Sequence, residues 1–153
     1  MTDATTSAAE IEKLIPHRLP MRLVETIVRV DETSIETVSV VRDTWPTASD
    51  GQVRTLVLVE LIAQTAAALQ GWKERREKEA GMGGLLVGIP TAKVCQPTVP
   101  VGTRLVCSVR MAHGAPQYQA FDGHVEDGAS VLLLSGSIQA FRPDLPDQPG
   151  ERT

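Results

Sequence analysis

Glu60 has the position in this chain that best suits acid–base chemistry. It is the single carboxylate in the apolar run Leu56 to Gln64, and no Lys or Arg lies one helical turn away to pair with it. A carboxyl group in apolar surroundings is costly to desolvate, so it is usually either paired or functional. Glu60 could also be a core acid bonded to a neighbour or facing a solvated edge. We favour the functional interpretation.

A helix is expected to carry Glu60. The start of the run could alone be a buried strand, but the Ala, Leu, Gln, Lys, Glu and Arg residues that follow are strong helix formers. We predict a helix from about Val53 to Ala80, with Ser49 or Asp50 able to cap its start. Its first half is apolar all round, which predicts that it is buried.

One face of this helix carries a second polar residue. Gln64 lies one turn after Glu60 on the same face, and Leu56, Ala67 and Gly71 extend the same line. Small side chains at positions 67 and 71 would let another element approach closely.

The rest of the chain has the composition of strands and turns. After a short helix at Ala9 to Ile15, stretches rich in Val, Ile, Leu and Thr predict strands. They are Leu23–Val30, Ile35–Arg42, Leu85–Cys95, Arg104–Met111, Tyr118–Glu126 and Val131–Phe141. The first two should form a hairpin, and Pro90 predicts an edge or a bulge.

The order of these elements predicts an α+β fold. Two strands, one long helix and four strands do not alternate, so a parallel doubly wound sheet is unexpected. We predict one antiparallel sheet of five or six strands wrapped around a single helix. The whole chain, 1–153, is expected to be one domain with an ordered core at about 9–143 and flexible termini.

Composition argues against several functional classes. The net charge of −4 and the 3% aromatic content argue against binding to nucleic acid. The N-terminus lacks the pattern of a signal peptide, and the apolar run at 56–69 is too short to span a membrane. We therefore expect a cytoplasmic protein. Two cysteines of unrelated spacing predict no metal site, and we expect no cofactor.

Three segments resemble one family. The chain is similar to the hotdog-fold acyl-thioester proteins, and specifically to the 3-hydroxyacyl-acyl-carrier-protein dehydratases. One segment matches their opening Pro-His-Arg and first strand, one their central helix with Glu-x-x-x-Gln, and one their strand–Pro-x-x-Pro-Gly–strand. These segments are IPHRLPMRLVETIVRVDE, VRTLVLVELIAQTAAAL and GIPTAKVCQPTVPVGTRL. In the third, Val101 separates Pro100 from Gly102.

The resemblance implies where the chemistry would take place. Hotdog subunits join their sheets edge to edge, and an acyl chain on phosphopantetheine enters a tunnel between the subunits. The family's catalytic acid matches Glu60 and its glutamine matches Gln64. The backbone N–H that polarises the thioester carbonyl would match Thr55, where the family commonly has Gly. With Leu56 beside them, Thr55 and Gln64 form the expected substrate-binding set.

The chain departs from the family at the second catalytic group. The dehydratases carry His-Phe-Pro in the loop before the helix, and Thr44-Trp45-Pro46 stands there instead. A threonine hydroxyl cannot take a proton near neutral pH, so Thr44 cannot replace that histidine as a base. For His17, in the Pro-His-Arg segment, we favour a structural role, although it is the one imidazole that could substitute.

Three functions remain open. The protein could be a lyase-type dehydratase of 3-hydroxyacyl thioesters in fatty-acid or polyketide-type synthesis, active alone or only with a His-bearing hotdog partner. It could be a thioesterase of acyl-CoA or acyl-carrier protein that uses Glu60 alone. It could also be a non-catalytic hotdog subunit. The expected partners are an acyl-carrier protein or CoA thioester and a second hotdog chain, in a homodimer or a mixed dimer.

Overall fold

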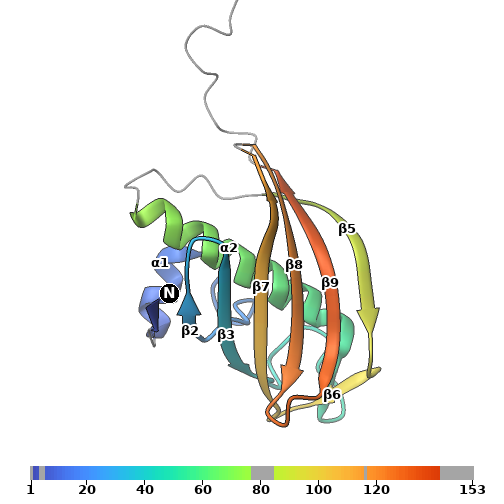
Figure 1. Cartoon of the computed structure of the whole chain (residues 1–153). Helices are drawn as coiled ribbons and strands as arrows, with labels where there is room; N and C mark the ends of the chain where they lie inside the picture. Colours follow the sequence, from blue (N-terminus) through green and yellow to red (C-terminus); the bar gives the residue numbers. More distant parts are fainter. Residues whose placement is uncertain (1, 4–5, 77–84, 116, 142–153) are drawn as a thin grey trace, which may run out of the picture.

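The computed structural model describes residues 2–3, 6–76, 85–115 and 117–141. Apart from three strands of two or three residues, its elements follow the predicted order of a short helix, two strands, a long helix and four strands (Figure 1). The strands of the main sheet are β1 (Thr2–Asp3), β2 (Thr26–Val30), β3 (Ser34–Val40), β5 (Leu85–Val94), β7 (Arg104–Gly114), β8 (Tyr118–Asp127) and β9 (Leu132–Phe141). The helical elements are α1 (Ala8–Leu14), a 3-10 turn η1 (Thr55–Val57) and α2 (Leu58–Arg76).

The main sheet is antiparallel and lies across α2 (Figure 1). Its order is β1-β2-β3-β7-β8-β9-β5, so six long strands are joined by the two-residue β1. This confirms the predicted α+β hotdog arrangement, including the hairpin of β2 and β3. A second, small sheet that the sequence did not predict pairs β4 (Gln52–Arg54) with β6 (Thr98–Pro100).

The predicted start of the long helix is wrong by several residues. Val53 lies in β4 opposite Val99 of β6, and its β-branched side chain is buried there. Asp50 and Gly51 form a turn with φ of 54° and 75°, and no side chain caps η1. Neither Ser49 nor Asp50 therefore caps the helix. The predicted end at Ala80 lies outside the described residues.

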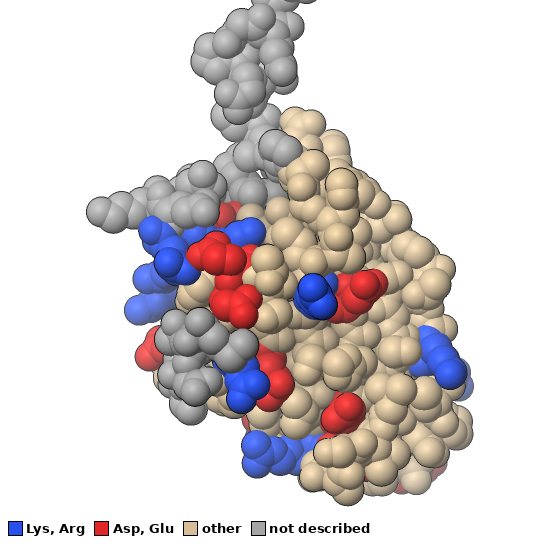
Figure 2. All heavy atoms as spheres, in the orientation of Figure 1, with Lys and Arg blue, Asp and Glu red and all other residues tan. Residues whose placement is uncertain are grey.

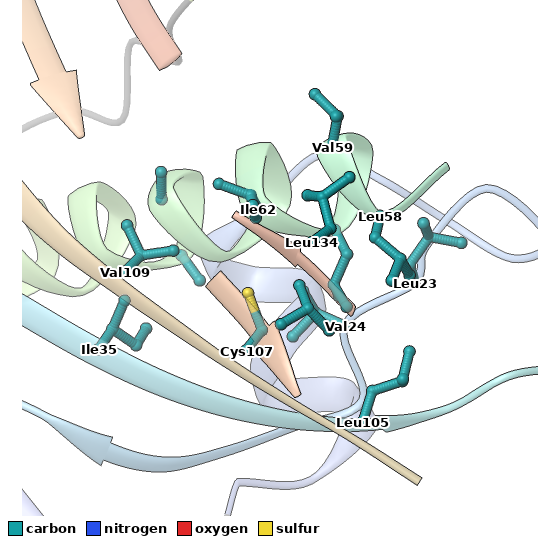
Figure 3. Close-up of a cluster of buried hydrophobic side chains, with 14 of the residues drawn as sticks. Leu23, Val24, Ile35, Leu58, Val59, Ile62, Leu105, Cys107, Val109 and Leu134 are labelled. Carbon is teal, nitrogen blue, oxygen red and sulfur yellow. The ribbon is translucent and has the colours of Figure 1, made fainter. Parts of the chain in front are cut away.

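The core lies between α2 and the sheet. Leu58 and Ile62 on α2 face Leu105, Cys107 and Val109 on β7, and all five side chains are buried (Figure 3). Leu105, Cys107 and Val109 lie on the same face of β7, because successive side chains of a strand point to opposite faces and these three residues are two positions apart. The apolar first half of the predicted helix thus packs against the sheet in the core, but the expectation that it is buried all round is wrong at Leu56, which is 60% exposed.

Close approach at Gly71 also agrees with the sequence. A Cβ atom at position 71 would lie 2.3 Å from the backbone oxygen of Leu14, at the end of α1. The small residue therefore lets α1 pack directly against α2, as the line of small side chains predicted.

The N-terminal segment has more defined contacts than expected. Thr6 Oγ1 accepts a hydrogen bond from the N–H of Ile27, and Ser7 caps α1 through the N–H of Glu10. Some of the N-terminal residues expected to be flexible are thus bonded to α1 and β2. The C-terminal tail expected to be flexible, from Pro143, lies outside the described residues.

Strand β5 is an edge of the sheet. Within the described part of the chain it pairs with β9 alone, and its register shifts on both sides of Gly88, next to Pro90. The predicted edge and bulge are both present. Cys95 follows this strand and Cys107 lies on β7, and both thiols are free.

The helical segment Thr55–Arg76 is long and apolar enough to cross a membrane by length and composition. The sequence had suggested that the apolar run was too short. More than half of its apolar window, 56%, is buried inside the structure. In this structure the segment therefore packs as the core helix of the fold.

Candidate functional site

The first turn of α2 presents Glu60 at the edge of the core. Its side chain is 38% exposed, so the carboxyl group can be reached from outside the chain. The neighbouring Val59 and Leu61 are buried and fix the rotation of the helix. The helix thus carries one acid on a half-exposed stripe beside a well-packed core.

Gln64 binds the carboxylate and a backbone loop together. Its Nε2 donates to Glu60 Oε1 at 2.9 Å and to the carbonyl oxygen of Met21 at 2.8 Å. Its Oε1 accepts from the N–H groups of Leu23, at 2.7 Å, and Val24, at 3.4 Å. The side chain is fully buried, and both ends of its amide are satisfied.

This network explains where β2 begins. The sequence predicted a strand from Leu23, but the N–H groups of Leu23 and Val24 are bonded to the Gln64 side chain rather than to a neighbouring strand. The ladder with β3 accordingly starts at Thr26.

The structure brings His17 next to Glu60. Nε2 of His17 lies 3.4 Å from Oε1 of Glu60, and the imidazole is 31% exposed. Its other ring nitrogen, Nδ1, is buried without a hydrogen-bond partner among the described residues. The sequence favoured a mainly structural role for His17, whereas the structure makes it part of the polar cluster around the acid.

The segment that carries His17 is held by arginine side chains. Arg18 Nη1 donates to the carbonyl oxygens of Ile15 and His17, each at 2.9 Å. Arg22 is buried and pairs with Glu12 of α1. The arginine bonds tie the segment to α1, and the bond from Gln64 to the carbonyl oxygen of Met21 holds it against α2.

Exposed apolar side chains accompany this cluster. Leu56, one turn before Glu60, is 60% exposed, and Met21, whose carbonyl Gln64 binds, is 51% exposed. Leu19 in the same segment is also exposed. Exposed apolar groups beside a polar site are typical of surfaces that an apolar ligand or another chain covers. The substrate-binding role expected of Leu56 stays a prediction.

The expectation for Thr55 needs a correction. Its N–H was expected to be free to polarise a carbonyl group, but it donates to the carbonyl oxygen of Pro97 at 3.1 Å. The side chain is fully buried, and its Oγ1 has no partner within the described residues. The bond forms because the segment between β5 and β6 lies against the start of η1.

Thr44 lies apart from the cluster. Its side chain is exposed in the loop before β4, next to the buried Trp45. No hydrogen bond or ion pair joins it to Glu60 or His17 in the described part of the chain. One subunit therefore brings together Glu60, Gln64 and His17 but not Thr44.

A separate hollow lies on the opposite face of the sheet. It measures about 570 Å³, and its polar lining includes Arg110, Asp122 and His124. Charged side chains are sparse on this face over β8, β9 and β5 (Figure 2). The hollow does not include Glu60. Among the described residues, no group of three or more His, Cys, Asp or Glu side chains could hold a metal ion.

Comparison with known proteins identifies the family. The family model of the ApeP-like dehydratases matches residues 9–150. The chain belongs to the ApeP-like dehydratase family. Membership confirms the dehydratase resemblance seen in the three sequence segments. No functionally curated protein matches the chain in sequence.

Solved structures support the fold of this ApeP-like protein. The dehydratase heterocomplex ApeI:P from Xenorhabdus doucetiae has a TM-score of 0.80 at 21% identity, covering 88% of this chain and 91% of the matched chain. The PaaI protein of E. coli, from the phenylacetic acid degradation operon, has a TM-score of 0.59 at 14% identity, covering 76% and 81%. A hypothetical thioesterase with coenzyme A from Streptococcus pneumoniae TIGR4 has a TM-score of 0.59 at 10% identity, covering 75% and 82%.

The sequence indicated Glu60, Gln64 and His17 as candidate residues but did not indicate all the contacts between them. The Glu-x-x-x-Gln spacing indicated that Glu60 and Gln64 share a face. The bonds of Gln64 to the Met21 carbonyl and the Leu23 N–H could not be inferred. Nearly every residue has the same backbone groups, so the residue types do not show which of them bind a side chain. The closeness of His17 depends on how the segment before β2 folds back onto α2.

Proposed function

We propose that this protein is a dehydratase subunit for 3-hydroxyacyl thioesters of an acyl carrier protein, in fatty-acid or polyketide-type synthesis. Glu60 is the general acid. The observation that carries this proposal is a carboxyl group that accepts a hydrogen bond from Gln64, lies 3.4 Å from Nε2 of His17 and is yet 38% exposed. A group held in place but open to substrate is suited to proton transfer.

The proposed reaction is an elimination of water. A base removes a proton from C2 of the acyl chain, and the electrons of that C–H bond form the C2–C3 double bond. The C3–O bond breaks, and the leaving hydroxyl group takes its electrons and a proton from Glu60. The products are water and a 2-enoyl thioester, and Glu60 regains its proton from the protonated base or from solvent.

We propose that the base comes from a partner hotdog chain. Thr44 cannot act as a base near neutral pH, and His17 is in direct contact with Glu60. This contact leaves no space for the C2–C3 unit of a substrate between the two side chains. The similarity to the ApeI:P dehydratase heterocomplex supports a mixed assembly.

A mixing assay tests the proposal. The purified protein is incubated with 3-hydroxyacyl-carrier protein, alone and with hotdog proteins that carry the loop histidine, and the 2-enoyl product is measured by mass spectrometry. We expect little product from the protein alone and turnover on mixing. In the active mixture, Glu60→Gln should lower turnover at least ~10²-fold while assembly is retained.

Glu36→Gln is the matched control, because Glu36 lies beside the hollow on the opposite face of the sheet. It should leave turnover unchanged. Wild-type turnover by Glu60→Gln would show that Glu60 is not the acid. Efficient dehydration by the protein alone that survives His17→Ala would show that a base in this chain remains unidentified.

Thioester hydrolysis is the second candidate. A carboxylate on the central helix could activate water, and a hotdog thioesterase with coenzyme A has a similar fold. The same incubations distinguish the two reactions, because hydrolysis releases a free thiol and no 2-enoyl product. Thiol release by the protein alone that Glu60→Gln abolishes would favour the thioesterase. A lack of both products in every mixture would favour a non-catalytic subunit.

A further inference from the structure

We infer that His17 is a positioning residue that determines which oxygen of Glu60 carries the acidic proton. The inference rests on the proposed function, in which Glu60 acts as the acid. It is carried by the 3.4 Å approach of His17 Nε2 to Glu60 Oε1 and by the bond from Gln64 to the same oxygen.

Gln64 is a donor to Glu60 and cannot be reversed. Its Oε1 accepts from the N–H groups of Leu23 and Val24, and its Nε2 also faces the carbonyl oxygen of Met21. An amide turned by 180° would place its oxygen against that carbonyl and its N–H groups against two other N–H groups. The hydrogen-bond network therefore fixes an N–H donor on Oε1.

His17 supplies the second donor in its neutral form. A neutral imidazole carries one N–H, on either Nδ1 or Nε2. Nδ1 is buried without a partner in the described residues, and a buried N–H group without an acceptor is destabilising. Nε2 faces Oε1 of Glu60, which is an acceptor. The proton of the ring therefore belongs on Nε2.

Two donors on one oxygen decide the position of the carboxyl proton. Oε1 accepts a hydrogen bond from Gln64 and has Nε2 of His17 3.4 Å away, so the inferred place of the hydrogen in the protonated form of Glu60 is Oε2. Among the described residues, Oε2 has no hydrogen-bond partner, and the side chain is 38% exposed. In this proposal His17 directs the acidic proton to Oε2, the carboxyl oxygen that is free to meet a leaving hydroxyl group.

Other charged groups near His17 are engaged elsewhere. Arg18 donates to backbone carbonyls, including that of His17 itself, and lies 3.5 Å from a carboxylate oxygen of Glu12. Arg22 also pairs with Glu12. Neither guanidinium group is bonded to Glu60, because both are bonded to Glu12 or to backbone carbonyls, and the imidazole is the side chain of this segment that lies next to Glu60.

The first test measures the tautomer of His17 in the protein alone. The protein is labelled with ¹⁵N-histidine, and the imidazole nitrogens are observed by NMR at alkaline pH, where the rings are neutral. The exposed His113 and His124 serve as internal references, and single His→Gln variants assign the three signals. We expect the Nε2–H form for His17, with signals that change in Glu60→Gln.

The Nδ1–H form would overturn the inference, because the proton of Glu60 would then lie between Oε1 and Nε2, turned away from substrate. Signals of His17 that do not respond to Glu60→Gln would also overturn it. This measurement needs neither substrate nor partner. A failure of the proposed function in the mixing assay would therefore leave its result intact.

The second test uses the active mixed complex. His17→Ala should lower kcat about tenfold or more and change KM less than about threefold, because the loss falls on proton transfer. In His17→Gln, the side-chain amide can place an N–H donor where Nε2 of His17 lies. This variant should therefore recover most of the kcat that His17→Ala loses. His124→Ala, on the opposite face of the sheet, is the control. Equal losses in the Ala and Gln variants would overturn the inference.

Discussion

The backbone N–H of Leu23 donates a 2.7 Å hydrogen bond to Oε1 of Gln64, a residue 41 positions later on α2. The other end of the same amide binds Glu60 Oε1 and the carbonyl oxygen of Met21. One buried side chain therefore joins the segment that carries His17 to the helix that carries Glu60. The stability of the fold and the geometry of the candidate site depend on the same amide.

Gln64→Leu should be strongly destabilising. It removes a buried amide and leaves the N–H of Leu23 and the carbonyl of Met21 without partners. Each buried unsatisfied group costs about 1–3 kcal/mol, so we expect a loss of about 2–4 kcal/mol in the free energy of unfolding, measured in urea. Gln70→Leu is the control, because Gln70 is half-buried on the same helix and donates only a long 3.5 Å bond to Glu74. Equal losses in both variants would contradict the argument.

Edge strand β5 is expected to join two subunits. Val94 on this strand is 45% exposed in the single chain, and an exposed edge readily pairs with another chain. Val94→Lys should lower the dimer content at micromolar concentration in sedimentation velocity. Val131→Lys is a matched control, because Val131 is also 45% exposed but lies outside β5. A wild-type protein that sediments as a monomer would contradict the expected assembly.

We expect Asp31 to make the stability of the folded protein depend slightly on pH. The N–H of Thr33 donates to its carboxylate at 2.9 Å, with further bonds from Ser34, and these lower the pKa of Asp31 below its usual 3.8. A lowered folded-state pKa stabilises the protein above the unfolded pKa, and this contribution is lost as pH falls through the folded pKa. The group is half-exposed, so solvent screening should keep the effect below about 1 kcal/mol.

The measurement compares the free energies of unfolding of wild type and Asp31→Ala near neutral pH and in acid. The difference should shrink in acid. Asp43→Ala is the control, because Asp43 is exposed and no hydrogen bond or ion pair of its side chain appears in the described structure. A difference that grows as pH falls would contradict the sign of the shift.

Cys107 should be inert in the folded protein. Burial raises the pKa of its thiol to about 12, so very little thiolate exists near pH 8. A thiol reagent should modify the half-buried Cys95 first and reach Cys107 only when the protein unfolds. In Cys95→Ser, rapid modification should disappear under native conditions. A fast-reacting thiol in that variant would show that β7 opens readily.

The strands of the main sheet were predicted well, because stretches rich in Val, Ile, Leu and Thr favour strands. On β7, for example, Leu105, Cys107 and Val109 are buried at every second position. The helix start was missed because Val53 is paired with Val99, far along the chain, and helix propensity carries no information on such a partner.

The candidate site was predicted in part. Glu60 and Gln64 are neighbours by helical periodicity alone. The contact of His17 with Glu60 depends on a loop that is held by hydrogen bonds to backbone groups. Such bonds cannot be predicted from the pattern of residue types. The N–H of Thr55 was misjudged for the same reason, because its acceptor, the Pro97 carbonyl, follows the distant strand β5.

Gly71 has a consequence for divergence within the family. Its missing side chain leaves room for the Leu14 carbonyl, and a Cβ atom there would lie only 2.3 Å away. A relative with a larger residue at this position must shift α1 or lack it. The segment carrying the counterpart of His17 directly follows α1, so it would move as well. The identity of one helical glycine should therefore mark, in an alignment of homologues, which relatives can share this arrangement around the acid.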